Sequence, residues 1–182
     1  MDIIEKNSIA WYVLRVTYQR EITASKALEE LQVEHYVPTI RTRIRNEKGI
    51  SIGWKTEPLV HNYIFIHDTY ENILRLKQGK LDYLRFIMAK DENGLVSVPQ
   101  YVPDKQMNDF IKVVHTMGSK PVDPNIDLRK GDRVRVLTGP FEGVEGVFIK
   151  MPTRHEKRVV IKIEGVAAVA TMALNASDIE KI

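Results

Sequence analysis

Three arginines at every second position are the residues of this chain best suited to binding a ligand. Arg41, Arg43 and Arg45 alternate with smaller or apolar residues, and a period of two places alternate side chains on one face of a β-strand. With Lys48, these cations could contact the phosphates of a nucleic acid, with an affinity that falls as salt rises. The alternative is an ordinary solvated hairpin, which a charged stretch of this kind also fits.

Positive charge is concentrated around these arginines. Residues 41–55 contain five basic residues and one acidic residue, a local charge of +4, whereas the whole chain of 182 residues carries +3. The calculated pI is about 9.0. A mildly basic chain permits contact with nucleic acid without requiring it, so the distribution of charge is more informative than its total.

Two aromatic residues are candidates for binding a protein partner. Tyr63 and Phe65 lie two apart in an apolar stretch and should therefore share one face of a strand. If exposed, they would form an apolar patch suited to the helices of a partner. The alternative is that both rings fill the core between sheet and helices, although the polar tip of Tyr63 favours a position next to solvent.

No constellation of catalytic residues stands out. The chain has five histidines and no cysteine. His61 and His67 could share a strand face, but no cysteine or pair of acids accompanies them to complete a metal site, so structural or surface roles are favoured. Phosphate-binding loops and serine-nucleophile motifs are missing from the sequence. We therefore expect a protein that is not an enzyme and needs no cofactor or metal; a metal-dependent enzyme at these histidines is the weakest alternative.

The order of expected elements predicts how these side chains are positioned. A β-α-β-β-α-β order followed by a helix is typical of a ferredoxin-like antiparallel sheet with helices. The expected strands and helices are 11–17 (strand), 21–31 (helix), 35–45 (strand), 54–68 (strand), 70–78 (helix), 84–88 (strand) and 103–114 (helix). Residues 46–49 are expected to form the tip of a hairpin.

The composition changes after residue 117. Residues 118–126 lack periodicity and contain two prolines, as a linker between domains does. The following stretch, from Gly131 to Lys150, alternates charged and apolar residues and contains four glycines, a pattern of short strands joined at glycine-containing turns. We therefore expect domains at 1–117 and 127–182 joined by the linker, with the second domain a small β-barrel and not a helical hairpin.

Three motifs, in this order, resemble one family. WYVLRV from Trp11 resembles the opening of the NusG N-terminal (NGN) domain, EPLVHNYIFI from Glu57 resembles its central strand, and GDRVRVLTGPFEGVEGVFIK from Gly131 resembles the KOW motif. The chain is thus similar to the NusG-like transcription elongation and antitermination factors. The form of the central strand and the basic hairpin suggest a specialised paralogue of RfaH or UpxY type. The fold implied is α+β, a ferredoxin-like NGN domain followed by an SH3-like β-barrel (KOW).

The resemblance also implies function and partners. The NGN domain would bind the clamp helices of the largest RNA polymerase subunit through Tyr63, Phe65 and Trp11, and would suppress pausing or termination. The KOW domain would recruit ribosomal protein S10 or Rho through Phe141, and the arginine row would contact DNA or nascent RNA. The alternative is an RNA-binding module that acts on ribosomal or leader RNA.

The remaining expectation concerns location. The sequence contains no apolar run long enough to span a membrane, and its first residues lack the apolar region of a secretory signal. A chain without cysteine also fits a reducing compartment. We therefore expect a cytoplasmic protein without a membrane partner.

Overall fold

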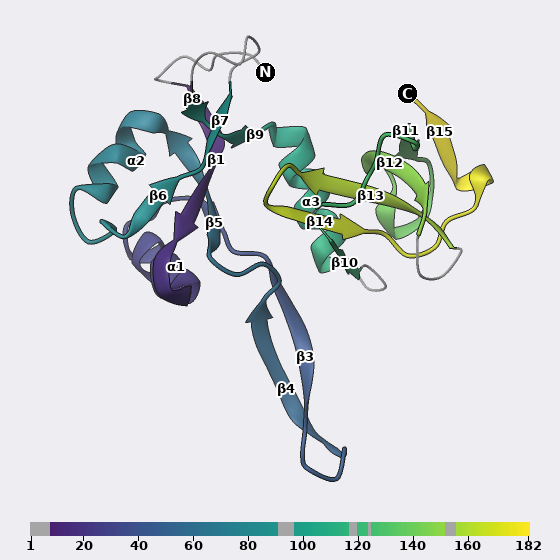
Figure 1. Cartoon of the computed structure of the whole chain (residues 1–182), viewed down its shortest axis with the longest axis horizontal. Coiled ribbons are helices and arrows are strands. Elements are labelled where there is room, and N and C mark those ends of the chain that lie inside the picture. Colours follow the sequence, from purple (N-terminus) through teal and green to yellow (C-terminus); the bar gives the residue numbers. More distant parts are fainter. Residues whose placement is uncertain (1–7, 91–96, 117–119, 124, 152–155) are drawn as a thin grey trace. The chain divides into compact units, whose positions relative to one another are not determined.

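Two compact units make up the computed structural model of the chain (Figure 1), which describes residues 8–90, 97–116, 120–123, 125–151 and 156–182. The first unit is Met1–Asp104 and the second is Lys105–Ile182. Each unit contains a large antiparallel sheet of its own. None of the described helices is both long enough and apolar enough to cross a membrane.

The first unit has the expected ferredoxin-like arrangement. Its main sheet has the strand order β2-β5-β1-β6, and β9 also pairs with β1. All of these pairings are antiparallel. The elements are β1 Ile9–Val16, α1 Glu21–Glu30, β2 His35–Tyr36, β5 Tyr63–Thr69, α2 Tyr70–Lys77, β6 Leu84–Phe86 and β9 Tyr101–Val102, with a short 3-10 turn at Thr17–Gln19. The α+β class predicted from the order of elements is confirmed for this unit.

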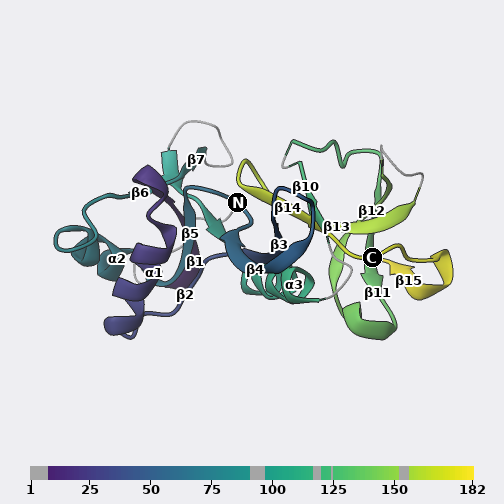
Figure 2. The same cartoon turned by 90° about the horizontal axis from the view of Figure 1, so that it is seen from below.

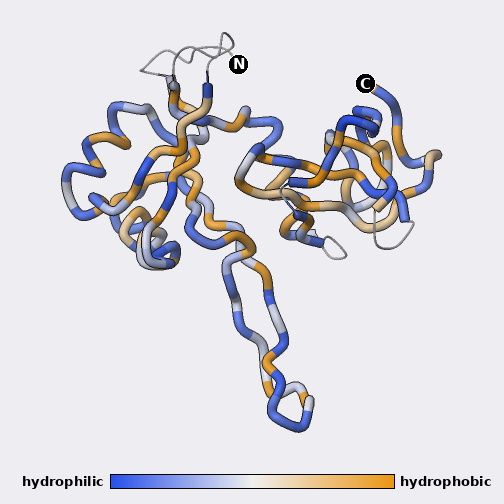
Figure 3. Tube along the Cα trace, viewed as in Figure 1, coloured by the Kyte–Doolittle hydropathy of each residue, from blue (hydrophilic) through white to orange (hydrophobic). Residues whose placement is uncertain are grey.

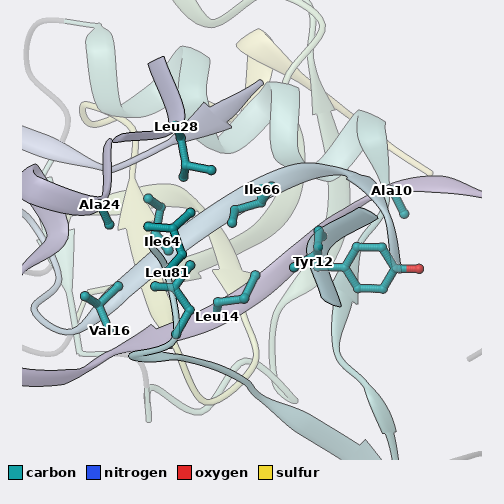
Figure 4. Packing of buried hydrophobic residues seen from close by; sticks show 11 residues of the cluster. Ala10, Tyr12, Leu14, Val16, Ala24, Leu28, Ile64, Ile66 and Leu81 are labelled. Carbon is teal, nitrogen blue, oxygen red and sulfur yellow. The ribbon is translucent and has the colours of Figure 1, made fainter. Parts of the chain in front are cut away.

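Helices α1 and α2 pack on one face of this sheet (Figure 2). Figure 4 shows the core between these helices and the sheet. Alternate residues of each strand contribute to it, because successive side chains of a strand point to opposite faces of the sheet. Its buried members include Tyr12, Leu14 and Val16 of β1, Ile64 and Ile66 of β5, Ala24 and Leu28 of α1, and Ile73 of α2. Burial of each large aliphatic side chain stabilises the fold by about 1.5–3 kcal/mol. The intervening residues of β1 and β5 therefore lie on the opposite face.

Pro38 divides the predicted strand 35–45 in two. Strand β2 lies at the edge of the main sheet, whereas β3 (Thr39–Arg45) pairs, among the described strands, only with β4 (Ser51–Pro58). Proline has no N–H to donate to a ladder, which explains why the edge strand ends before it. The β3–β4 hairpin extends away from the main sheet of its unit (Figure 1). A second hairpin pairs β7 Met88–Lys90 with β8 Ser97–Pro99.

Asn62 determines where β5 begins, because it interrupts the predicted strand 54–68. Its φ is +69°, a left-handed conformation that asparagine tolerates better than most residues. Its N–H donates to the carboxylate of Glu21, which is buried, and its carbonyl accepts from the Val16 N–H at 2.8 Å. These bonds join the start of β5 to the end of β1 and the start of α1, and so position Tyr63.

The second unit begins one residue into α3 (Asp104–His115) and contains a six-stranded sheet of order β10-β14-β13-β12-β11-β15. The strands are β10 Lys120–Val122, β11 Asp132–Val136, β12 Glu145–Lys150, β13 Lys157–Ile163, β14 Ala167–Ala170 and β15 Ile179–Lys181, with 3-10 turns at Gly139–Phe141 (η2) and Ala176–Asp178 (η3). Wherever residues 127–182 are described, they form strands and short turns, as a small barrel requires, and not a helical hairpin.

One strand of this sheet falls where a linker is predicted. Strand β10, residues 120–122, lies within the stretch 118–126 and pairs with β14. Residues 118, 119 and 124 of that stretch lie outside the described residues. The domain boundaries at 117 and 127, and the role of the stretch as a linker, stay predictions.

Two different physical reasons explain the glycines of the second unit. Gly139 and Gly143 both have a φ of +81° with open space around them, so their backbone conformation requires glycine. Gly146 instead lies in β12, and an added Cβ would stand 2.6 Å from the Val160 carbonyl oxygen and 2.7 Å from Val159 Cγ1. The expected association of the glycines in 131–150 with turns is therefore wrong for Gly146, where close packing between strands excludes a side chain.

Candidate functional site

Strand pairing brings the three predicted protein-binding aromatics onto one face of the first sheet. In the β1–β5 ladder Val13 lies opposite Phe65, and Trp11 lies opposite His67. Tyr63 precedes Phe65 by two residues and therefore points the same way. None of the three belongs to the core beneath α1 and α2, so they share the face opposite these helices.

The exposure of these three residues differs. Phe65 is fully buried and Trp11 is 5% exposed, whereas Tyr63 is half-buried. Phe65 is therefore buried, but not in the core between the sheet and the helices that the alternative named, and Tyr63 lies partly next to solvent. In this structure the three aromatic rings therefore do not form an exposed apolar patch.

Two further residues belong to this face and were not predicted to belong to it. Tyr36 of β2 lies opposite Phe65 in the ladder, with the ring centroids 6.4 Å apart, and burial raises the pKa of its hydroxyl well above the ordinary value. His67 stacks on Trp11, with the centroids 4.7 Å apart and the planes 13° from parallel. His67 could have been found from its period-two spacing after Phe65, whereas a two-residue strand offers no such pattern for Tyr36.

Histidines 61 and 67 lie in different surroundings. His67 Nδ1 is 2.5 Å from a Glu34 carboxylate oxygen, whereas His61, in the turn before β5, has its Nδ1 3.9 Å from Glu21. Over the described parts of the chain, no group of three or more metal-ligating side chains is gathered.

The β3–β4 hairpin carries the predicted arginine row. Arg41, Arg43 and Arg45 are all exposed and, as alternate residues of β3, share a face. Lys48 lies in the exposed turn that joins the strands, where its N–H donates to Asn46 Oδ1 at 3.0 Å. A side-chain oxygen that accepts from backbone two residues on is the usual reason for asparagine at such turns, and the predicted hairpin tip is confirmed.

Trp54 also belongs to this face and was not singled out from the sequence. It lies directly opposite Arg43 in the ladder and is 52% exposed. The guanidinium carbon of Arg43 lies 5.1 Å from its ring centroid, and that of Arg41 lies 5.5 Å away. We use the name arginine–tryptophan face for Arg41, Arg43, Arg45 and Trp54. A count of residues outward from the predicted tip does not give this pairing, because the register shifts between Ile44 and Arg45.

The predicted partner-binding residue of the second unit, Phe141, is fully buried. It is the last residue of η2, so its ring is not an open contact surface in this structure. The backbone just after it is bound by α3: Lys112 Nζ donates to the Glu142 carbonyl at 2.6 Å, and the Asp109 carboxylate accepts from the Glu145 N–H at 3.0 Å. Asp109 also accepts from Lys105 Nζ at 2.5 Å. Helix α3 thus fixes the segment that follows Phe141.

The structure thus presents a sheet face that carries aromatic residues, an exposed basic hairpin and a second β unit. A family model described as transcription termination factor NusG matches residues 9–111, more than half of the chain. The chain therefore belongs to the NusG family, whose members are transcription factors and not enzymes. Among solved structures, that of "Domain interaction in Thermotoga maritima NusG" is 21% identical; the match covers 98% of this chain and 99% of that one, with a TM-score of 0.44.

Proposed function

We propose that this chain binds RNA polymerase through the sheet face that carries Trp11, Tyr63 and Phe65, suppresses pausing or termination, and recruits a second partner through its second unit. The observation that supports this is the strand register, which places the three aromatics on the face opposite α1 and α2. The polymerase element is the clamp helices of its largest subunit. The factor acts by stabilising one state of the polymerase through binding, not by covalent chemistry.

The burial of two of these residues determines how binding proceeds. Tyr63 and its cross-strand neighbour Arg15 are the accessible end of the face, so contact begins there. Trp11 and Phe65 are buried and must become accessible before they contact a partner. Polymerase binding is therefore coupled to a change around this face.

The hairpin and the second unit supply the other two parts of the proposed function. Arg41, Arg43, Arg45 and Lys48 contact DNA or nascent RNA near the polymerase, which their exposure permits. The η2 turn, with Phe141 as its buried anchor, recruits ribosomal protein S10 or Rho. Action beside the polymerase places the protein in the cytoplasm.

A substitution of Tyr63 tests the polymerase surface. Purified polymerase is titrated with the full chain, with Tyr63→Ser, and with Tyr18→Ser as a matched control, since Tyr18 is 83% exposed at another site of the same unit. We expect Tyr63→Ser to weaken binding about ten-fold or more, as tyrosines at the centre of interfaces do, and the control to bind normally. Normal binding by a folded Tyr63→Ser variant would show that the surface is assigned wrongly.

The basic hairpin also supports the alternative of an RNA-binding module. That function predicts tight, strongly salt-dependent binding of RNA by a chain that retains no polymerase. The same titration distinguishes the two, because the alternative requires that the parent chain itself fail to bind polymerase.

A further inference from the structure

Trp54 is exposed in a part of the fold that offers it no core. Strands β3 and β4 form a two-stranded sheet that, among the described strands, pairs with no other. Trp54 is 52% exposed, whereas the other tryptophan, Trp11, is 5% exposed. Tryptophan is highly buried on average in folded proteins, so its position here suits contact with a ligand.

The groups around the indole are cations without neutralising partners. Arg43 and Arg41 lie 5.1 and 5.5 Å from the ring, and Arg45 is on the same face of β3. Among the described residues, no carboxylate forms an ion pair with any of these three arginines. The nearby carboxylate of Glu57 is instead bound by Lys55 at 2.6 Å and by the Thr42 hydroxyl at 2.5 Å. Because side chains alternate along a strand, Glu57, Lys55 and Thr42 lie on the face of the hairpin opposite the arginines and Trp54.

An aromatic ring among guanidinium groups that pair with no carboxylate is complementary to a nucleotide whose base is unpaired. A base stacks on an aromatic side chain through its flat face, and arginines bind the flanking phosphates. In a duplex both faces of each base are already stacked, so only edges and phosphates remain accessible. The pairing of a stacking surface with phosphate-binding groups therefore favours a single strand.

We propose that the arginine–tryptophan face binds single-stranded nucleic acid, with a base stacked on Trp54 and phosphates bound by Arg41, Arg43 and Arg45. This rests on the proposed function, which assigns the hairpin to nucleic acid, and it adds the strandedness of the ligand and the residue that recognises it. A base that stacks on the ring displaces the guanidinium group on that side to a phosphate, so this arginine exchanges a weak cation–π contact for a charge-assisted hydrogen bond.

Two other roles for this face lead to different results. If Trp54 only stabilises the hairpin through its arginines, its removal changes stability and leaves binding of nucleic acid intact. If the hairpin instead enters the major groove of a duplex, as a two-stranded ribbon can, duplex is bound at least as tightly as a single strand. Both results are outcomes of the experiment that follows.

The test measures binding of labelled oligonucleotides to the full chain by fluorescence anisotropy. The probes are a single-stranded DNA, a single-stranded RNA and a duplex DNA of the same length and sequence. The variants are Trp54→Ala, Trp54→Phe and Arg129→Ala; the last removes an exposed arginine of the second unit. Circular dichroism monitors the fold of each variant.

We expect the single strands to bind more tightly than the duplex. Trp54→Ala should weaken single-strand binding about ten-fold, which is within the range for loss of one stacked base, and Trp54→Phe should retain most of it. Arg129→Ala should bind as the parent does. With three phosphate contacts, the logarithm of affinity should fall with the logarithm of salt with a slope of about −2, and each Arg→Ala change on the face should reduce that slope by about 0.7.

Three results would overturn the proposal: no binding of either single strand, duplex bound as tightly as single strand, or Trp54→Ala without effect on single-strand binding. Preference for the DNA or the RNA strand identifies the source of the ligand. Polymerase binding by Trp54→Ala is measured in parallel. If that variant loses polymerase while no oligonucleotide binds, the hairpin contacts protein, and the assignment of the Tyr63 surface is unaffected.

Discussion

Replacement of Gly146 tests how closely the strands of the second unit pack. Gly146 lies in β12, where an alanine Cβ would stand 2.6 Å from the carbonyl oxygen of Val160 and 2.7 Å from Val159 Cγ1. The carbonyl belongs to β13, whose Val160 pairs with Val147 of β12. The oxygen cannot move away without disturbing that ladder. Gly146→Ala therefore overpacks the sheet, at a cost of about 1–3 kcal/mol.

Gly139 is the matched control, because its requirement for glycine has a different origin. Its φ is +81° and nothing lies within 4 Å of an added Cβ, so only backbone conformation opposes a side chain. Gly139→Ala should cost about 1–2 kcal/mol, and Gly139→Asn distinctly less, because asparagine tolerates the left-handed region. At Gly146, asparagine should lower the free energy of unfolding at least as much as alanine does, because there is no room for any Cβ at that position.

Thermal unfolding of the full chain measures these differences. A loss of 2 kcal/mol in a unit of this size lowers Tm by roughly 8–16 °C. Since two units can unfold separately, amide hydrogen exchange in β12 and β13 assigns the transition to the second unit. The reasoning is refuted if Gly146→Ala costs less than about 0.5 kcal/mol, or if asparagine at Gly146 restores the stability that alanine removes.

Two further predictions concern a backbone conformation and an ion pair. Asn62→Ala should lower the free energy of unfolding by about 1–2 kcal/mol, because φ is +69° there, whereas Asn62→Gly should cost less; equal losses in chemical denaturation would contradict this. Hydrogen bonds from Arg129 lower the Asp127 pKa from 3.8 to about 2. Since the depressed pKa belongs to the folded state, this pair contributes stability above pH 4 that is lost as pH falls toward 2. Arg129→Ala should return the pKa to its ordinary value in an NMR titration, and an unchanged pKa would exclude this cause.

The pattern of the sequence was sufficient to predict the main elements of the first unit. Period-two alternation placed Arg41, Arg43 and Arg45 on one face, and their exposure agrees with that. Thr69 is of the residue type that commonly caps a helix, and its hydroxyl accepts from the Asn72 N–H at 3.2 Å at the start of α2. These features could be predicted because they depend on residues within one element or one turn.

Other features depend on residues far apart in the chain. The breaks in two predicted strands follow from Pro38 and from Asn62, and the latter is held by Glu21, 41 residues away. The burial of Phe65 and Phe141 could not be inferred from their own segments, in which both residues could equally have been exposed. The binding of the segment after Phe141 by α3 also joins positions more than 30 residues apart.

The sequence alone determined the family, the order of elements, the basic hairpin and the two faces of its strands, because motifs and periodicity are local properties of the chain. Only the tertiary structure decided which aromatic residues are accessible, that Gly146 is required for packing and not for a turn, and that Trp54 stands beside two arginines. Each of these depends on what lies opposite a residue across a ladder or a core. Register and burial are set by the pairing of distant segments, which local pattern constrains only weakly.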